Sequence, residues 1–227
     1  MTGFREVADR VWVARQEWFD LNVCLVGGAD GLLVVDTQAS ARAARAIVDD
    51  VRALGVGPVT AVFNTHEHFD HTFGNGAFRE AFGGVPIHAH DEAAARTVEA
   101  GERVKQRCAD ESGDPRGEEV LETEIVTADH TFSSVRVLEL GDRQVELVVH
   151  LQDDAQADRS HDVVDLVSRR LAHGDGLGVG PPRFGAVSLE LVGRCFRRTG
   201  GAVPMQSLTP HVPAGRMLAM RVTASRR

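Results

Sequence analysis

The sequence is poor in several residue types that would otherwise define its class. Its 227 residues include three cysteines, no tyrosine and a single lysine, Lys105. Cys24, Cys108 and Cys195 are an odd set without CxxC spacing, which indicates free thiols in a reducing compartment rather than a disulfide framework. No run approaches about eighteen consecutive apolar residues, and the first ten residues carry acids, Glu6 and Asp9, where a signal peptide would need a basic start and an apolar run. We therefore expect no membrane span and a cytoplasmic location.

The rest of the composition is that of a globular protein, but its charge is unevenly distributed. Contents of 43% hydrophobic and 26% charged residues exclude collagen-like, coiled-coil and wholly disordered chains. Residues 183–227 carry eight arginines and one acid, Glu190, whereas residues 1–182 carry 17 basic and 32 acidic groups. A basic segment therefore follows an acidic body.

Strand and helix patterns alternate over the first two-thirds of the chain. Short β-branched runs predict strands at residues 10–14, 21–27, 31–37, 59–64, 85–89, 134–140 and 144–150. Apolar residues at three- and four-residue spacing predict a helix over 40–54, and further helices are expected over 76–82 and 90–108. The turn at residues 29–31 predicts a hairpin, and polar residues 109–119 predict a surface loop. This order indicates a layered α/β domain.

Beyond residue 150 the patterning weakens. Residues 162–167 are compatible with a strand, but residues from 183 onwards show no periodicity, and we expect the last seven residues to be disordered. Basic residues are scattered there rather than aligned on one face, and only Phe184 and Phe196 supply aromatic rings. That pattern argues against a nucleic-acid contact.

The most informative stretch is Asn64-Thr65-His66-Glu67-His68-Phe69-Asp70-His71, directly after a predicted buried strand. Three imidazoles and a carboxylate fall within six residues, and side chains two residues apart in an extended chain project to the same side. Imidazole and carboxylate are ligands that Zn²⁺ accepts, and three protein ligands plus a water make a catalytic site. The segment therefore predicts a catalytic metal centre.

The pattern His66-x-His68-x-Asp70-His71 resembles the defining motif of the metallo-β-lactamase superfamily. The resemblance extends from about Val7 to His150 and implies an α/β fold, a four-layer αβ/βα sandwich with metals at one edge of two sheets. It also implies up to two Zn²⁺ ions, with Fe or Mn as alternatives in the second site. A metal-bound hydroxide would then hydrolyse a small ester, thioester, lactone or lactam.

The resemblance also assigns roles to individual residues. His66 and His68 correspond to ligands of the first metal, and Asp70 and His71 to ligands of the second. Asp70 would in addition hold the attacking water and pass its proton to the leaving group. Asp36 resembles an acid that orients the ligand histidines. Its alternative is an ordinary turn residue at the end of a strand.

Three further family ligands are harder to place in this sequence. Asp175, after an apolar run that ends in Gly-Asp, resembles the bridging carboxylate, and the nearby His173 is an alternative. No Gly-His-Thr segment follows His150, so His150, His161 and His211 remain candidates for the missing histidines. We expect a metallo-β-lactamase-like domain over residues 7–182, with an incomplete second half, and a basic segment over 183–227.

Two readings of this divergence stay open. The chain is either a zinc-dependent hydrolase of a small-molecule substrate or a degenerate member with impaired metal binding and no catalysis. Residues 181–185 still resemble a family loop among unfamiliar neighbours. The basic, unpatterned tail motivates a further hypothesis, that insertions or deletions put short stretches and the whole tail out of frame. Resequencing the gene tests that hypothesis directly.

Overall fold

The structure is a computed structural model, and it describes residues 3–111, 115–152, 186–192 and 217–226. For residues 148–152, 186–192 and 217–226 the description covers the backbone alone. His161, His173, Asp175 and His211 lie outside the described residues, as do residues 181–185. His150 lies in a described strand, but its side chain is not part of the description.

Seven strands in chain order form the first sheet. They are β1 (Arg5–Ala8), β2 (Val11–Gln16), β3 (Leu21–Gly27), β4 (Leu32–Val35), β5 (Val59–Phe63), β6 (Ile87–His90) and β7 (His130–Phe132). Strands β1 to β4 are antiparallel, and β4 to β7 are parallel. The predicted hairpin is confirmed as the β3–β4 pair, and the short strands β1 and β7 were not predicted.

Strand β4 shows why its sequence is a continuous apolar run. Leu32 and Val34 pack with the helices, whereas Leu33 and Val35 pack toward the second sheet. All four residues are buried because successive side chains point to opposite faces and both faces are covered. The sheet therefore lies inside the molecule, between a helical layer and another sheet.

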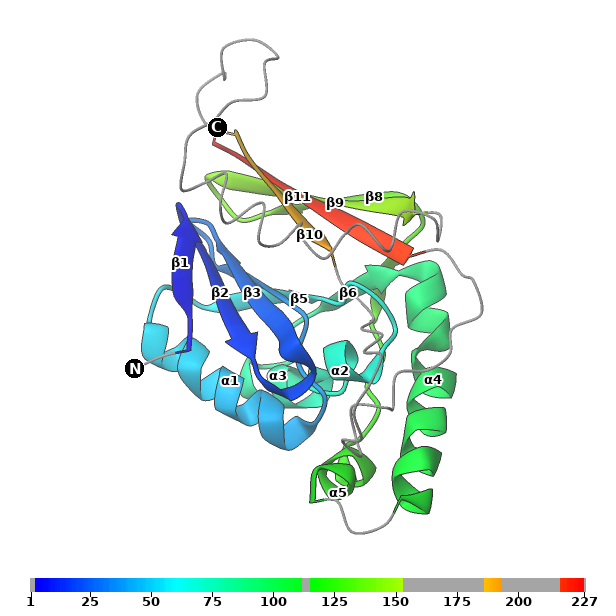
Figure 1. Ribbon diagram of the computed structural model, residues 1–227. Helices are drawn as coiled ribbons and strands as arrows, with labels where there is room; N and C mark the ends of the chain where they lie inside the picture. Colours follow the sequence, from blue (N-terminus) through cyan, green and yellow to red (C-terminus); the bar gives the residue numbers. More distant parts are fainter. Residues whose placement is uncertain (1–2, 112–114, 153–185, 193–216, 227) are drawn as a thin grey trace.

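The helical layer lies on the side of the first sheet away from the second (Figure 1). It contains α1 (Ala41–Leu54), α2 (Phe69–Thr72), α3 (Asn75–Ala81), α4 (Asp91–Asp110) and α5 (Pro115–Glu122), and a 3-10 turn, η1 (Trp18–Asp20), joins β2 to β3. Helix α1 begins where the Ser40 side chain accepts the Ala43 N–H and ends at Gly55, whose φ of 66° is left-handed. The prediction of a loop over 109–119 is wrong at residues 109–110, which continue α4, and again from Pro115 onwards, because proline starts a helix well.

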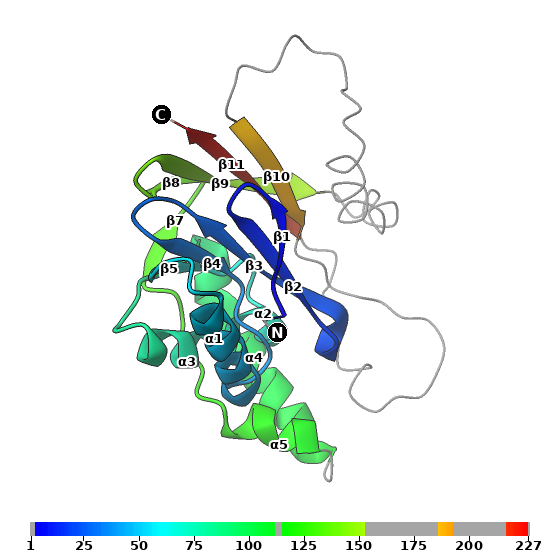
Figure 2. The ribbon, with the colours of Figure 1, turned by 90° about the vertical axis from the view of Figure 1, so that its left-hand side faces the viewer.

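The second sheet has the order β10-β11-β9-β8, with β8 (Val135–Glu139), β9 (Arg143–Gln152), β10 (Ala186–Val192) and β11 (Met217–Arg226). Figure 2 shows it stacked on the first sheet. Leu138, Leu140, Val145 and Leu147 fill the space between the sheets. Strand β11 reaches Arg226, so the expectation of disorder over the last seven residues is wrong for 221–226. The pattern of apolar and polar residues alone does not reveal a strand whose pairing partners are distant in sequence.

The predicted α/β fold of stacked sheets with an outer helical layer is thus confirmed. The segments expected to supply the fourth layer of the sandwich lie outside the described residues.

Candidate metal centre

The motif residues lie at the carboxyl ends of two parallel strands. Strand β4 ends just before Asp36, and β5 ends just before the segment that begins at Asn64. These strands are neighbours in parallel register, so both strand ends open at the same edge of the sheet. The loop after β5 carries His66 and His68, and the single turn of α2 carries Asp70 and His71.

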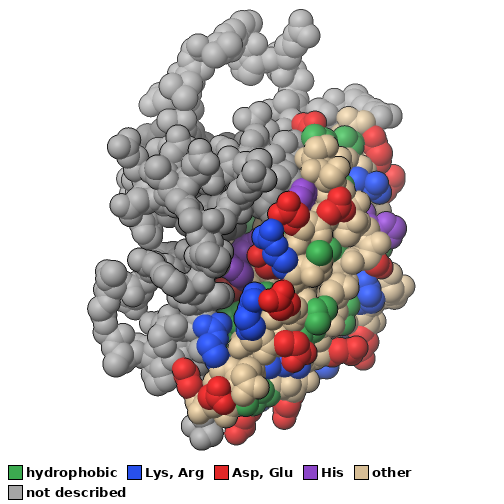
Figure 3. Space-filling view, turned by 90° about the vertical axis from the view of Figure 1, so that its right-hand side faces the viewer, with side chains coloured by type: hydrophobic (Ala, Val, Ile, Leu, Met, Phe, Trp, Pro, Cys, Tyr) green, Lys and Arg blue, Asp and Glu red, His purple; other side chains and the backbone are tan. Residues whose placement is uncertain are grey.

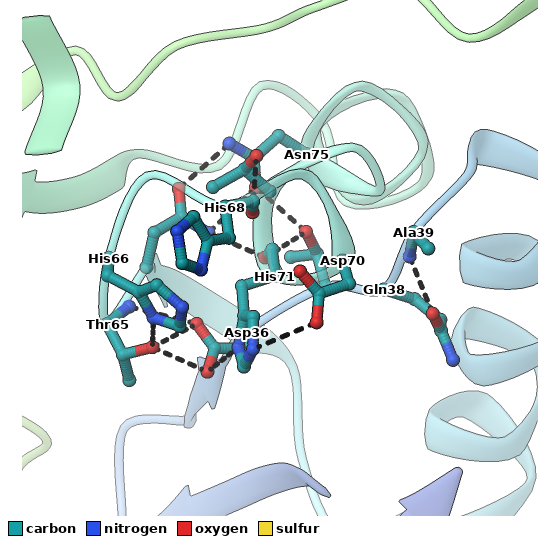
Figure 4. A network of polar contacts seen from close by, with 12 residues as sticks. Asp36, Gln38, Ala39, Thr65, His66, His68, Asp70, His71 and Asn75 are labelled. Carbon is teal, nitrogen blue, oxygen red and sulfur yellow. Dashed lines mark hydrogen bonds and ion pairs between the residues drawn. The ribbon is translucent and has the colours of Figure 1, made fainter. Parts of the chain in front are cut away.

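Asp36 is the centre of the hydrogen-bond network at this edge (Figure 4). Its buried carboxylate accepts the Thr65 N–H at 2.9 Å and lies 2.8 Å from Nδ1 of His71. The Thr65 hydroxyl lies 2.8 Å from Oδ2 of Asp36 and 2.9 Å from Nδ1 of His66. The expectation that Asp36 orients motif histidines is therefore supported by its direct contact with His71. Thr65 links the same carboxylate to a second ring, that of His66.

These contacts show that Nδ1 carries a proton in two histidines. The Thr65 hydroxyl has one proton, which it donates to Asp36, so it accepts from Nδ1–H of His66. His71 likewise donates Nδ1–H to Asp36. Nε2 of His66 and Nε2 of His71 are both buried and make no hydrogen bond within the described residues. In each ring, Nε2 thus lies on the side opposite the group that holds Nδ1.

The four motif side chains lie together. Ring centroids are 4.1 Å apart for His66 and His71 and 4.6 Å apart for His66 and His68. Nε2 of His71 lies 3.4 Å from Oδ2 of Asp70, an ionic contact longer than a good hydrogen bond. The structure therefore brings together His66, His68, Asp70 and His71, with Asp36 behind them.

Burial and neighbouring charge shift the protonation of these groups in different directions. Burial lowers the pKa of His66 well below its ordinary value, and His71 and His68 add to the effect. Burial also opposes a charge on His71, but the Asp36 and Asp70 carboxylates outweigh it and raise the pKa of His71 to about 10. For Asp70, burial acts to raise the pKa, and the charge of His71 reverses the sign, so the pKa is lowered. The cluster thus places a positive charge between two carboxylates, as a cation would be placed.

A buried pair of amide side chains, Asn64 and Asn75, supports the backbone of the site, and the sequence patterns did not single it out. Nδ2 of Asn64 donates to Oδ1 of Asn75 at 3.0 Å, and Nδ2 of Asn75 returns a bond to Oδ1 of Asn64 at 2.8 Å. Nδ2 of Asn64 and the Thr37 backbone N–H both donate to the His71 carbonyl. The position of Asn64 next to the motif was the only sequence signal, because the pairing with Asn75 depends on the turn between α2 and α3.

The donors suit a borderline cation, but the described residues form only part of a ligand shell. Neutral imidazole nitrogen and carboxylate oxygen are ordinary Zn²⁺ ligands, and two buried nitrogens point away from their hydrogen-bonded partners. Within the described residues, however, no group of three or more His, Cys, Asp or Glu side chains is arranged as a metal ion requires. Binding would therefore need a small adjustment of the motif side chains or further donors.

The sequence matches the profile described as Metallo-beta-lactamase superfamily over residues 17–153, more than half of its length. The chain belongs to the metallo-β-lactamase superfamily. No curated protein matches it.

Solved structures of the same fold include two β-lactamases. Native FEZ-1 metallo-β-lactamase from Legionella gormanii matches with 18% identity and a TM-score of 0.51, over 67% of this chain and 55% of that one. A HARLDQ-motif mutant metallo-β-lactamase from Cronobacter sakazakii matches with 20% identity and a TM-score of 0.50, over 65% and 54%. The chain therefore spans about half the length of these β-lactamases.

A sec-alkyl sulfatase, the S233Y F250G double mutant of PisA1, shares the fold at 20% identity and a TM-score of 0.50, over 67% of this chain and 28% of that one. The fold thus occurs in hydrolases that act on different bonds.

Proposed function

We propose that this protein is a zinc-dependent hydrolase of a small ester, thioester, lactone or lactam. One observation carries the proposal: the Thr65 hydroxyl, itself bonded to Asp36, fixes Nδ1–H of His66, and the buried Nε2 of the same ring makes no hydrogen bond within the described residues. A buried polar atom without a partner is costly, so its presence in a cluster of three histidines and an aspartate indicates a ligand.

His66 and His68 would hold the first zinc, and Asp70 and His71 the second, which also accepts Fe or Mn. Asp175 remains our proposal for the bridging carboxylate. When bound, zinc supplies positive charge that acidifies a water molecule and polarises the substrate carbonyl.

The chain's own residues then have distinct tasks. Asp36 and Thr65 orient the two rings, and the amide pair of Asn64 and Asn75 fixes the backbone on which His71 sits. The Asp70 carboxylate would accept a proton from the attacking water and return it to the leaving group. The β-lactamases and the sulfatase among the structural relatives support hydrolysis as the reaction class.

A second candidate is a degenerate member of the family that binds metal weakly and catalyses nothing. The lack of a recognisable Gly-His-Thr segment after His150 favours it. The two candidates make opposite predictions about hydrolysis.

The test is a panel of p-nitrophenyl acetate, a thioester, a lactone and a cephalosporin, assayed with native protein, with chelated protein and after zinc is restored. The hydrolase predicts turnover of at least one substrate, loss of turnover on chelation and recovery with zinc. Asp70→Asn should reduce kcat by about 100-fold or more. Zinc-loaded protein that hydrolyses none of the four would favour the degenerate member.

A further inference from the structure

Four aromatic rings connect the β2–β3 turn to the helix that carries Asp70 and His71. We call Trp18, Phe19, Phe69 and Phe73 the aromatic column. Phe19 stacks with Trp18 at 5.4 Å between ring centroids and meets Phe69 edge-on at 5.1 Å, with an interplanar angle of 83°. Phe69 in turn meets Phe73 at 5.6 Å and 75°. Such edge-to-face contacts fix relative position because they depend on angle as well as distance.

The turn that presents Phe19 has an unusual backbone. Phe19 has φ 65° and ψ 4°, and Asp20 has φ 53°, so two consecutive residues other than glycine adopt the left-handed region. An ion pair of 2.6 Å between Nε of Arg15 and Oδ1 of Asp20 spans the turn, and the Arg116 guanidinium covers the Trp18 ring at 4.6 Å. Backbone strain of this kind persists only where surrounding contacts enforce it, and it concentrates near functional sites.

Helix α2 needs external support because it is a single turn. A helix this short has few internal hydrogen bonds, so packing determines its position. Its C-terminal part is held by Asn64 and Thr37, which bond the His71 carbonyl. Its N-terminal part is held by Phe69, which is buried, adjoins Asp70 and receives the edge-on contact of Phe19.

We propose that Phe19 is a positioning residue for the metal centre: through Phe69 it fixes the start of α2 and thereby the placement of Asp70 and His71. This role rests on the proposed function for its purpose, but the placement of His71 can be measured in zinc-free protein. Loss of the ring at position 19 would let the start of α2 move, whereas loss of the Phe82 ring, which lies outside the aromatic column, would not.

The test compares Phe19→Leu with Phe82→Leu. Phe82 is a matched control because it is also partly buried and also contacts one phenylalanine, Phe78 at 5.9 Å between ring centroids, but at the far end of α3. In zinc-free protein, the ¹⁵N–¹H spectrum of the His71 ring should shift in Phe19→Leu and stay as in the wild type in Phe82→Leu. In zinc-loaded protein, Phe19→Leu should weaken zinc affinity by about 10-fold relative to Phe82→Leu, and Phe19→Tyr, which keeps the ring, should restore both properties.

Equal His71 spectra in Phe19→Leu and Phe82→Leu would overturn the proposal and leave the column as ordinary packing. If Phe19→Leu does not fold, Phe19→Met provides the same comparison with a more adaptable side chain. If the wild type binds no zinc, the proposed function fails, while the His71 spectra still decide the positioning role.

Discussion

At the scale of single residues, the site depends on which nitrogen of each imidazole carries the proton. Asp36 accepts Nδ1–H of His71 directly and holds Thr65, which accepts Nδ1–H of His66. One carboxylate thus orients the rings of His66 and His71, the first and last residues of the motif. Its φ of 61° brings the side chain under the loop after β5, at a position where aspartate tolerates the left-handed region better than most residues.

Replacing Asp36 with asparagine should weaken zinc binding by about 10- to 100-fold. The amide keeps the shape of the side chain but loses the charge that keeps Nδ1 of His66 and of His71 protonated. Chelator competition measures the affinity. Asp142→Asn is the matched control, since Asp142 is an exposed carboxylate paired with Arg10 in a distant turn. Equal zinc affinities of the two variants would contradict the role of Asp36.

A second titratable residue lies outside the site and sets a dependence of stability on pH. His88 is buried on β6, beside His130 on β7, with Arg136 and Asp129 nearby. Burial, together with His130 and Arg136, lowers the pKa of His88 to about 4 from its ordinary 6.5, and Asp129 opposes the shift only weakly. The folded state therefore resists protonation of a ring that the unfolded chain protonates readily.

Above pH 6.5 the His88 ring is neutral in both the folded and the unfolded chain, so it does not reduce stability. Because the folded pKa is lower than the unfolded one, the free energy of unfolding falls as the pH falls from 6.5 toward 4. The free energy of unfolding of the wild type, relative to His88→Leu, should fall by about 2 kcal/mol between pH 7 and pH 5. Urea denaturation of both proteins at the two pH values measures this difference. Parallel pH curves for the two proteins would contradict it.

At the scale of elements, the junction between α2 and α3 is pressed against the end of β4. The Gly74 N–H donates to the Gln38 carbonyl at 2.9 Å, and a Cβ on Gly74 would overlap the Thr37 carbonyl oxygen and lie 2.6 Å from Cβ of Ala44. The φ of Gly74 is -77°, so space rather than backbone conformation requires the glycine. The close approach places His71 within reach of Asp36.

Gly74→Ala should lower the free energy of unfolding by about 3 kcal/mol, because backbone atoms cannot move aside as a flexible side chain can. Gly76→Ala, two residues further on, is the control: its Cβ would meet only the Cγ2 of Val126 at 3.3 Å, and alanine favours the helix. Chemical denaturation compares the two. A Gly74→Ala variant as stable as Gly76→Ala would show that the junction is looser than described.

The elements around the motif were predictable because their signals are local. A continuous apolar run marked β5, and the capped, periodic pattern of 40–54 marked α1. The four clustered site residues follow from spacing within one segment. In contrast, no local pattern predicts a contact between residues that are distant in the sequence. The contacts of Asn75 and Phe19 and the pairing of β11 are of this kind.

At the scale of the whole molecule, two reciprocal ion pairs join the sheets at the turns. Arg143 donates to the Asp9 carboxylate at 2.8 Å and to its backbone carbonyl, and Arg10 forms a bidentate pair with Asp142 at 2.9 and 3.0 Å. The Arg143 side chain is 2% exposed, whereas that of Arg10 is 29% exposed. The two pairs thus differ in how strongly water can replace a lost partner.

Asp9→Asn should lower the free energy of unfolding by about 2 kcal/mol, because it leaves a buried guanidinium without its carboxylate. Asp142→Asn should cost less, since water solvates the exposed Arg10. Urea unfolding of both variants measures the asymmetry. Equal or reversed costs would contradict the view that the Arg143 pair is the main contact between these turns.

Charge on the described surface is mixed on the face formed by α4, where basic and acidic side chains alternate (Figure 3). Arg96 pairs with Glu92 and Arg103 with Glu99, each one helical turn apart.

Among the helices of the described residues, none has the length and apolar character that a membrane-spanning helix needs.

The most direct test of the account is the zinc content of purified wild-type protein and of His66→Ala, measured by mass spectrometry after dialysis against metal-free buffer. We predict between one and two zinc ions per chain for the wild type, and the loss of at least one ion in His66→Ala while the variant stays folded. Equal zinc content in the two proteins would contradict the assignment of His66 and its neighbours as the metal centre.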